Sequence, residues 1–478
     1  MNRVFFAVIA AFSLAISSHA MVKLPSIMGD NMVIQQNSKV RLWGQARPGA
    51  EVCIRVSWDA DALYKLSSDK DGKFEIAIPS PGATYTPQII TFNDGDGEVT
   101  IKNVLVGEVW FAGGQSNMEM PLKGFAGCVV KDGMREAICA ESFKGVRFFT
   151  VPKRHSWTIE TDCESSWKTT ESFEDVMNFS ATAWFFARNL ESALHVPVGI
   201  VVCAYGGTRV ESWLPREILE NYPDIELTEE GMKNMQDYER PLLPYNAMFH
   251  VACRYTYKGI IFYQGCSNVG RHENYAKRLA TMVTHWRAVM GNGDIPFYYV
   301  EIAPYHYDGA QNEKSPYLRE AQFKAQKMIP NSAMVSTNNL VLPFEKHNIH
   351  PQLKQPVGER LSYHALNKVY GYKDVCCDGP QYSGAWKEKN GEAWVSFENL
   401  QMGICRNYDI QGFEVAGEDR IFHPADTIWL HWQTNEVVVS SKRVKQPVAV
   451  RYCFKDFMPG TLIGGNELPC IPFRTDEW

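Results

Sequence analysis

The segment LVGEVWFAGGQSNME, residues 105–119, decides the fold because it joins an apolar strand to a sharp polar turn. Residues 105–111 are mostly apolar, which is typical of a strand buried on both faces of a sheet. Two glycines then allow the chain to turn tightly, and Ser116 follows at the expected start of a helix. A strand, a glycine turn and a helix in this order are typical of a parallel α/β sheet.

The same pattern continues to about residue 371. Apolar runs predict four further strands, at 198–204, 259–263, 297–302 and 333–337. Two segments between them have the 3.6-residue period of helices with one buried face. Their apolar stripes are Phe179, Ala183, Ala187, Leu190 and Leu194 in one, and Tyr275, Leu279, Met282, Trp286 and Val289 in the other. We therefore predict an α/β domain with a parallel sheet over residues 105–371.

Both flanks of this domain have β character. Short alternating runs punctuated by Gly, Pro, Asn and Asp predict an N-terminal β-sandwich over residues 21–104. After residue 371 the helical period disappears, and β-rich runs predict a C-terminal β domain over residues 372–478, which could pack against the N-terminal one.

The first twenty residues predict a secretory signal peptide. A basic Arg3, an apolar run over 4–16 and the ending Ser18-His19-Ala20 form the three expected parts. The protein is then secreted or periplasmic, and no later segment is apolar for long enough to span a membrane. The formal net charge of −6 gives no basic footprint for nucleic acid.

The twelve cysteines have no paired C-x-x-C spacing, and no H-E-x-x-H motif occurs. The sequence therefore predicts no metal site. In an exported protein we expect a mixture of buried thiols and one or two disulfides, whose pairing is open.

Polar, glycine-rich turns follow three of the predicted strands, where ligands bind in an open parallel sheet. Ser116 follows the first strand, Gly206 and Gly207 follow the second, and Asn268 follows the third. A glycine amide and an asparagine side chain can stabilise the oxyanion of an acyl-transfer reaction. Ser116 is either a nucleophile or merely the N-cap of its helix.

A candidate base follows the last predicted strand. His350 precedes a proline, which favours an extended conformation in a loop, and a helix is expected to begin near Lys354. Its position at the same edge of the sheet favours a catalytic role over a structural one.

The chain order Ser, Gly, Asn, His resembles that of the SGNH (GDSL-like) hydrolase superfamily, which implies a flavodoxin-like α/β/α sandwich. More closely, the chain resembles the sialate O-acetylesterase family across nearly all of residues 21–478. The motifs that carry this resemblance are Gly113-Gly114-Gln115-Ser116-Asn117-Met118-Glu119, Gly206-Gly207-Thr208, Tyr263-Gln264-Gly265 with Ser267-Asn268, and Ile349-His350-Pro351 with Lys354.

The resemblance implies a serine esterase that removes acetyl groups from carbohydrates, without a cofactor. It implies Ser116 as nucleophile, His350 as general base, and Gly207 or Gly206 with Asn268 and the Ser116 amide as the oxyanion hole. Near these motifs, four polar side chains are candidates for substrate binding: Gln115, Glu119, Arg209 and Gln264.

The chain departs from the family pattern at two places. Cys266 stands where Glu is common, and it is an alternative nucleophile without an independent base. The superfamily's Asp before the catalytic histidine is missing, since Asn348 and His347 occupy those positions. Glu345 and Asn348 are the candidates for orienting His350, and a Ser-His dyad is the alternative.

Other functions stay open from sequence. Acetylated xylan or another glycan is an alternative substrate, and a carbohydrate-binding protein on a degenerate esterase scaffold is an alternative class. A lipase or general α/β-hydrolase is disfavoured because no G-x-S-x-G elbow occurs.

Overall fold

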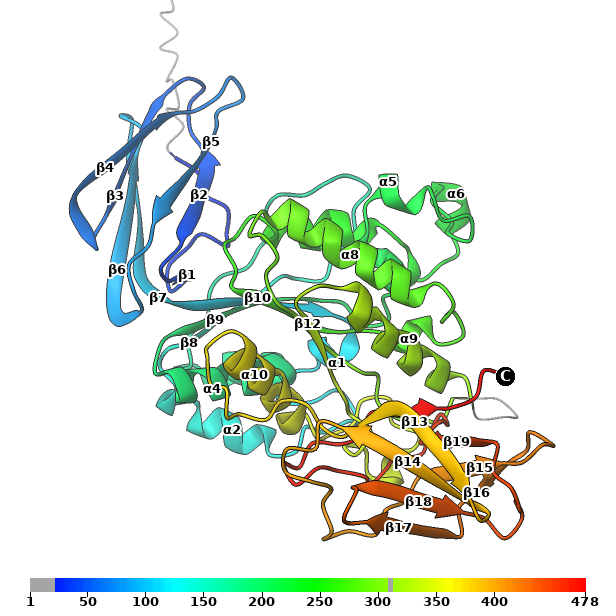
Figure 1. Ribbon diagram of the computed structural model, residues 1–478. Coiled ribbons are helices and arrows are strands. Elements are labelled where there is room, and N and C mark those ends of the chain that lie inside the picture. Colours follow the sequence, from blue (N-terminus) through cyan, green and yellow to red (C-terminus); the bar gives the residue numbers. More distant parts are fainter. Residues whose placement is uncertain (1–21, 308–312) are drawn as a thin grey trace, which may run out of the picture.

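The computed structural model describes residues 22–307 and 313–478. The predicted signal peptide lies outside the described residues. Figure 1 shows a central α/β layer structure with β-rich regions at two opposite ends. Among the described residues, no helix has the length and apolar character needed to cross a bilayer.

Six parallel strands form the central part of the largest sheet, in the spatial order β8-β9-β7-β10-β11-β12. Their bounds are β7 Glu98–Gly114, β8 Val146–Thr150, β9 Val198–Ala204, β10 Gly259–Tyr263, β11 Phe297–Val300 and β12 Ser332–Val335. The five strands predicted from the apolar runs are confirmed. The sequence analysis missed β8, which is short and lies beside β9 at the edge.

Helices cover both faces of this sheet (Figure 1), which gives three α/β/α layers. Helices α8 and α9 lie on one face, and α2, α4 and α10 lie on the other. Their bounds are α2 Gly133–Cys139, α4 Ala181–Leu194, α8 Tyr275–Met290, α9 Ser315–Met328 and α10 Gln355–Lys368. Both predicted apolar stripes point into the core, since all their residues except Leu194 and Val289 are buried. The predicted fold class is therefore confirmed.

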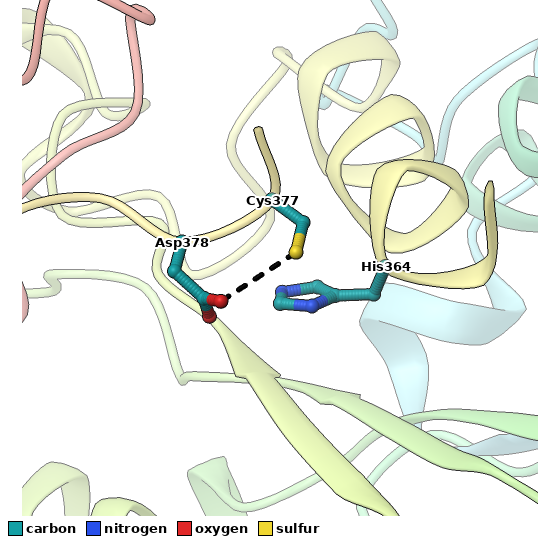
Figure 2. A group of neighbouring side chains, drawn as sticks. All are labelled: His364, Cys377 and Asp378. Carbon is teal, nitrogen blue, oxygen red and sulfur yellow. Dashed lines mark hydrogen bonds between the residues drawn. The ribbon is translucent and has the colours of Figure 1, made fainter. Parts of the chain in front are cut away.

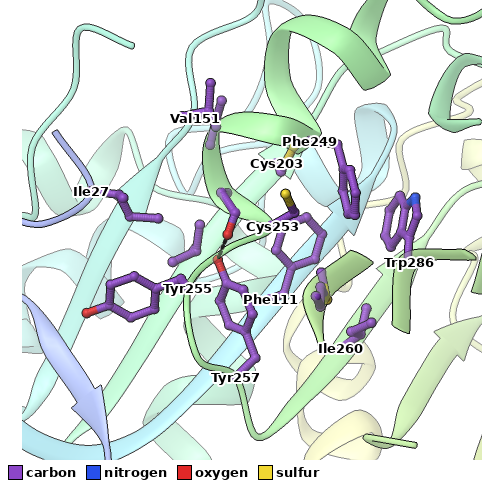
Figure 3. Close-up of a cluster of buried hydrophobic side chains, with 14 of the residues drawn as sticks. Ile27, Phe111, Val151, Cys203, Phe249, Cys253, Tyr255, Tyr257, Ile260 and Trp286 are labelled. Atoms are coloured by element: carbon purple, nitrogen blue, oxygen red, sulfur yellow. Dashed lines mark hydrogen bonds between the residues drawn. The ribbon is translucent and has the colours of Figure 1, made fainter. Parts of the chain in front are cut away.

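One side of the sheet packs on a dense aromatic cluster (Figure 3). Trp286 of α8 contacts Phe111 of β7 edge to face, with ring centroids 5.4 Å apart, and stacks on Phe249 at 4.6 Å. Such pairs add to the free energy gained by burying their large apolar surfaces. The cluster thereby anchors the strand that leads to Ser116.

Strand β7 continues from the N-terminal β region into the central sheet. Its first half pairs with β6 antiparallel, and its second half pairs with β9 and β10 in parallel. The expected domain border at residues 104 and 105 falls inside this strand. The other N-terminal strands are β1 Val33–Gln35, β2 Lys39–Gln45, β3 Glu51–Val56, β4 Asp59–Ser67, β5 Lys73–Pro79 and β6 Thr84–Asn93.

The C-terminal region contains two four-stranded sheets around a shared apolar core. They comprise β13 Gln381–Lys389, β14 Glu392–Glu398, β15 Phe413–Ala416, β16 Phe422–Pro424, β17 Thr427–His431, β18 Glu436–Ser440, β19 Ala449–Tyr452 and β20 Phe473–Arg474. Arg474 pairs with Glu320 of α9 at 3.0 Å. The region thus docks on the central layers and not on the N-terminal β region, which lies at the opposite end (Figure 1).

Short helices complete the chain: α1 Ser116–Glu119, α3 Phe173–Met177, α5 Arg216–Leu219, α6 Glu229–Met232 and α7 His250–Ala252. All twelve cysteines lie among the described residues and are free thiols. The expectation of one or two disulfides is therefore wrong for this structure, whereas the expected buried thiols are present.

Candidate active site

Ser116 lies at the carboxyl end of β7, on the first residue of the single-turn helix α1. Gln115 is the N-cap residue of this helix, and its side chain makes no capping hydrogen bond. Within the described part of the chain, the half-buried Ser116 hydroxyl makes no hydrogen bond. The alternative that Ser116 only caps the helix is therefore wrong, since Gln115 holds the N-cap position.

The glycines after β9 lie directly against Ser116. A Cβ atom added to Gly206 would lie 3.3 Å from the Cβ of Ser116, so only a glycine leaves this space open. The Gly206 amide donates to Glu119 Oε2 at 2.6 Å. Gly207 adopts a left-handed φ of +83° beneath the Tyr238 ring, and its amide has no partner among the described residues. Of the two candidate glycines, Gly207 therefore has the free donor.

Asn268, after β10, is fully buried and held on both ends of its amide. Its Oδ1 accepts hydrogen bonds from the Val210 amide at 3.1 Å and from Gln264 Nε2 at 2.8 Å. Its Nδ2 donates to Glu211 Oε2 at 3.0 Å, which leaves one amide hydrogen unused. Glu211 in turn pairs with Arg278 at 2.7 Å, and both side chains are at most 5% exposed. This network fixes the direction of the remaining donor.

Three of the four polar residues predicted to bind substrate are used within the protein. Gln264 Nε2 donates to Thr208 O at 3.2 Å as well as to Asn268, which uses both of its hydrogens. Gln115 Oε1 accepts from the Gly265 amide at 2.8 Å. Glu119 accepts from Gly206 and pairs with Lys153 at 2.8 Å. These side chains hold together the loops that follow β7, β9 and β10.

Arg209 differs from the other three because its guanidinium is only loosely paired. Its Nη2 lies 4.0 Å from Glu239 Oε1, and the side chain is 26% exposed. Burial, and then the nearby charge of Arg271, lower the pKa of Arg209. The carboxylates of Glu211 and Glu239 act in the opposite direction and offset part of this second positive charge.

His350 lies in the loop between β12 and α10. Its ring meets the Phe125 ring edge to face, with centroids 5.1 Å apart. Burial, and after it the charge of Lys354, lowers the pKa of His350 to about 4. The imidazole is therefore neutral at neutral pH, which is the form that can accept a proton.

The two candidates for orienting His350 hold its loop and not its ring. Asn348 Oδ1 accepts from the His350 backbone amide at 3.0 Å. The buried Glu345 carboxylate accepts from the amides of Leu342 and Gln352, at 3.0 and 2.9 Å. Over the residues that the structure describes, no hydrogen bond joins the imidazole to a carboxylate. The described residues therefore show neither a charged partner for the imidazole nor a hydrogen bond between it and the Ser116 hydroxyl.

Asn117 connects the serine helix to the histidine loop. Its Nδ2 donates to the Ile349 carbonyl at 3.0 Å, so the residue after Ser116 is bonded to the residue before His350. Lys354 Nζ donates to Asn117 Oδ1 at 2.5 Å from the start of α10. Ser116 and His350, far apart in sequence, are thus held at the same edge of the sheet.

Asn117 and Lys354 stand within the motifs quoted above, but no role was predicted for either. Burial lowers the pKa of Lys354 to about 7. A fully buried cation beside a candidate catalytic serine is a typical sign of a functional site, and its place three residues after His350-Pro351 was the available signal.

Cys266 is an unsuitable nucleophile in this structure. Burial raises the pKa of its thiol to about 11. At neutral pH the sulfur is therefore protonated, whereas the thiolate is the reactive form.

A parallel sheet that presents a serine, a glycine turn, an asparagine and a histidine on successive loops defines an SGNH-type hydrolase. The fold agrees with a crystal structure of a carbohydrate acetylesterase from Xanthomonas citri. The two have a TM-score of 0.84 and 29% sequence identity, over 96% of this chain and 100% of that one.

The model of the family described as "Carbohydrate esterase, sialic acid-specific acetylesterase" matches residues 106–367. This is more than half of the chain, which therefore belongs to that family and is a carboxylic ester hydrolase. The chain is also 25% identical to human sialate O-acetylesterase over 393 residues, and 26% identical to the mouse protein over 414 residues. These matches cover 75% of this chain, and 73% and 75% of the relatives.

Proposed function

We propose that this chain removes O-acetyl groups from carbohydrates through an acetyl-enzyme, with Ser116 as nucleophile and His350 as general base. The observation that carries the proposal is the bond between Asn117 and Ile349, which holds an unbonded serine hydroxyl and a neutral imidazole at one edge of the sheet. Serine needs such a base because its hydroxyl is a weak nucleophile at neutral pH.

The first half-reaction transfers the acetyl group to the enzyme. His350 accepts the Ser116 proton while Oγ attacks the acetyl carbonyl carbon. The amides of Gly207 and Ser116 and the unused Asn268 hydrogen stabilise the negative oxygen that forms. His350 then gives its proton to the departing sugar oxygen, and the carbohydrate leaves as an alcohol.

The second half-reaction restores the serine. His350 accepts a proton from a water molecule, whose oxygen attacks the acetyl carbonyl carbon. The proton returns to Ser116 Oγ as the acyl bond breaks, and acetate leaves. No cofactor enters this scheme, because the serine, the imidazole and the amide donors complete the proton and charge balance.

For the substrate, we propose an acetylated sialic acid. Sialic acids carry a carboxylate, and the loosely paired Arg209 follows the proposed oxyanion glycine Gly207 by two residues. The repulsion between Arg209 and Arg271 would be relieved by an anion. An acetylated xylan is neutral and would gain nothing from this charge.

The function is tested by acetate release from O-acetylated sialic acid, acetylated xylan oligomers and p-nitrophenyl acetate. We expect turnover by the wild type and by Ser383→Ala, an exposed serine in the C-terminal region, and none above background by Ser116→Ala with an intact circular dichroism spectrum. Acetylation of the Ser116 peptide, caught by acid quenching and mass spectrometry, tests the intermediate. Turnover by Ser116→Ala would contradict the mechanism.

The same panel distinguishes the alternatives. Arg209→Gln should raise KM for the acetylated sialic acid and leave KM for acetylated xylan unchanged, with Arg216→Gln on the exposed surface as the control. If the wild type prefers acetylated xylan, the proposed sialic acid substrate is wrong and xylan takes its place. Glycan binding without turnover on any acetylated substrate would favour a binding protein on an esterase scaffold.

We also propose that the chain is exported by residues 1–20. The proposal rests on the basic, apolar and small-residue parts of that segment. N-terminal sequencing of the mature protein should then start at Met21, and retention of Met1 in the exported protein would contradict it.

A further inference from the structure

Three side chains with metal-binding atoms meet where the central layers join the C-terminal β region. His364 lies near the end of α10, and Cys377 and Asp378 lie in the linker before β13. One ligand atom from each lies within 4.8 Å of the other two. Figure 2 shows the imidazole pointing toward the space between the thiol and the carboxylate. The group lies outside the proposed esterase site.

The imidazole of this group has no hydrogen-bond partner in the part of the chain that the structure describes. His364 is only 1% exposed, its Nδ1 is buried without a partner, and neither ring nitrogen takes part in a hydrogen bond among the described residues. Tyr298 of β11 stands beside it, with ring centroids 5.6 Å apart, and its hydroxyl is also buried without a partner. Buried polar groups normally have a partner, so two adjacent unpaired groups mark this position as one that could receive a ligand.

The contacts that do exist within the group can be replaced. The Cys377 thiol lies 3.5 Å from Asp378 Oδ2, a weak hydrogen bond at best. Lys368 Nζ lies 3.5 Å from the same oxygen, but its side chain is 47% exposed. The ammonium group can therefore turn into solvent when another cation takes its place.

We propose that His364, Cys377 and Asp378 bind one zinc ion. Nitrogen, sulfur and carboxylate oxygen are the donors that zinc prefers, whereas magnesium and calcium prefer oxygen alone. On binding, the Cys377 thiol loses its proton to solvent, and the thiolate and carboxylate together balance the two charges of the ion. Water or the Tyr298 oxygen completes the fourth position.

The ion would fasten the C-terminal β region to the esterase layers. His364 belongs to α10, which begins directly after the His350 loop, whereas Cys377 and Asp378 belong to the linker. Asn466, in the last segment of the chain, donates to the Asp378 carbonyl at 3.1 Å. A single zinc ion would thus join α10 to the linker, and the linker in turn holds the last segment through this hydrogen bond.

The test uses the full chain after treatment with a chelator and gel filtration. Titration with zinc chloride, followed by elemental analysis of the protein fraction, should give one bound equivalent that excess magnesium or calcium does not displace. Cobalt(II) at the same position should produce a thiolate-to-cobalt charge-transfer band. Less than one equivalent of zinc, or a cobalt complex without this band, would overturn the proposal.

Substitutions identify the ligands. Cys377→Ser and His364→Gln should weaken zinc binding by at least about tenfold, since even outer-shell partners contribute that much. The matched control is Cys376→Ser, which removes the adjacent thiol and should bind as the wild type does. Loss of binding in Cys376→Ser with retention in Cys377→Ser would refute the assignment.

A measurement on the unaltered chain decides the case in which His364→Gln does not fold. Bound zinc should slow the alkylation of Cys377 by iodoacetamide, followed by peptide mass spectrometry, and leave the rate at the exposed Cys139 unchanged. Equal alkylation of Cys377 with and without zinc would exclude it as a ligand.

Discussion

The loop after β10 and the loop after β12 lie at the same edge of the sheet but are built in different ways. Asn268 is fully buried, and Gln264, Val210 and Glu211 hold its amide from both ends. The His350 ring makes no hydrogen bond within the described residues and is held by packing against Phe125. The difference teaches that the proposed oxyanion donor is oriented before substrate arrives, whereas the base depends on its loop and on the substrate for its final orientation.

The largest expected effect comes from removing the proposed base, His350. His350→Ala should lower kcat by about 10³- to 10⁴-fold, because it removes the group that accepts the Ser116 proton. The measurement is kcat on p-nitrophenyl acetate. His347→Ala, three residues earlier and exposed, is the control and should keep its activity. A His350→Ala variant with more than a tenth of the wild-type kcat would remove His350 from the mechanism.

The next largest effect comes from removing the proposed oxyanion donor of Asn268. Asn268→Ala should lower kcat by about 10²- to 10³-fold with little change in KM, because the lost donor acts on a charge that exists only in the transition state. Asn274→Ala, an exposed asparagine before α8, is the matched control. A rise in KM with unchanged kcat would instead indicate that Asn268 binds the ground state of the substrate.

Two separate variants sharpen the comparison, since one changes a buried carboxylate beside Asn268 and the other changes a buried carboxylate in the His350 loop. Glu211→Gln should lower the free energy of unfolding by about 1–3 kcal/mol, because Arg278 loses part of its buried charge partner. Glu345→Gln should also destabilise its loop, but its kcat should fall far less than the roughly 10⁴-fold loss that follows removal of a histidine-orienting carboxylate. Urea denaturation and kcat measure the two effects. A loss near 10⁴-fold in Glu345→Gln would make Glu345 the third triad member.

The smallest expected effect concerns pH. His350 must be neutral to accept a proton, so activity should fall as the pH drops through its pKa of about 4. The charge of Lys354 contributes to this lowering, and Lys354 is protonated below its own pKa of about 7. Lys354→Met should therefore move the acid limb of kcat/KM to higher pH. An acid limb at the same or a lower pH would show that the charge of Lys354 does not act on His350.

Lys354 also links stability to pH. Its pKa is lower in the folded chain, at about 7, than the 10.5 of an exposed lysine, so the unfolded chain binds more protons between these values. Stability should then rise with pH across this window. Urea denaturation at both ends of the window should show that Lys354→Met lacks this part of the rise.

The sequence predicted the parallel strands because each is a continuous apolar run, a pattern that burial on both faces requires. It also predicted the loops that hold Ser116, Gly207, Asn268 and His350, because polar residues at strand ends meet at one edge. It could not show that Gln264 is used up by internal hydrogen bonds, since this depends on which way a side chain points. It missed the group of His364, Cys377 and Asp378 because a helix end and a linker form it without a spacing motif.

The length of strand β7 determines where the chain can be divided. Seventeen residues long, it forms part of the N-terminal sheet at one end and leads to Ser116 at the other. Cutting the chain at residue 105 would therefore divide one strand. Its first part would stay paired with β6, whereas β1 would lose its partners at residues 105–107, and the strand that leads to Ser116 would lose its N-terminal half. The N-terminal region therefore supports the strand that leads to Ser116, and we expect a fragment without this region to aggregate.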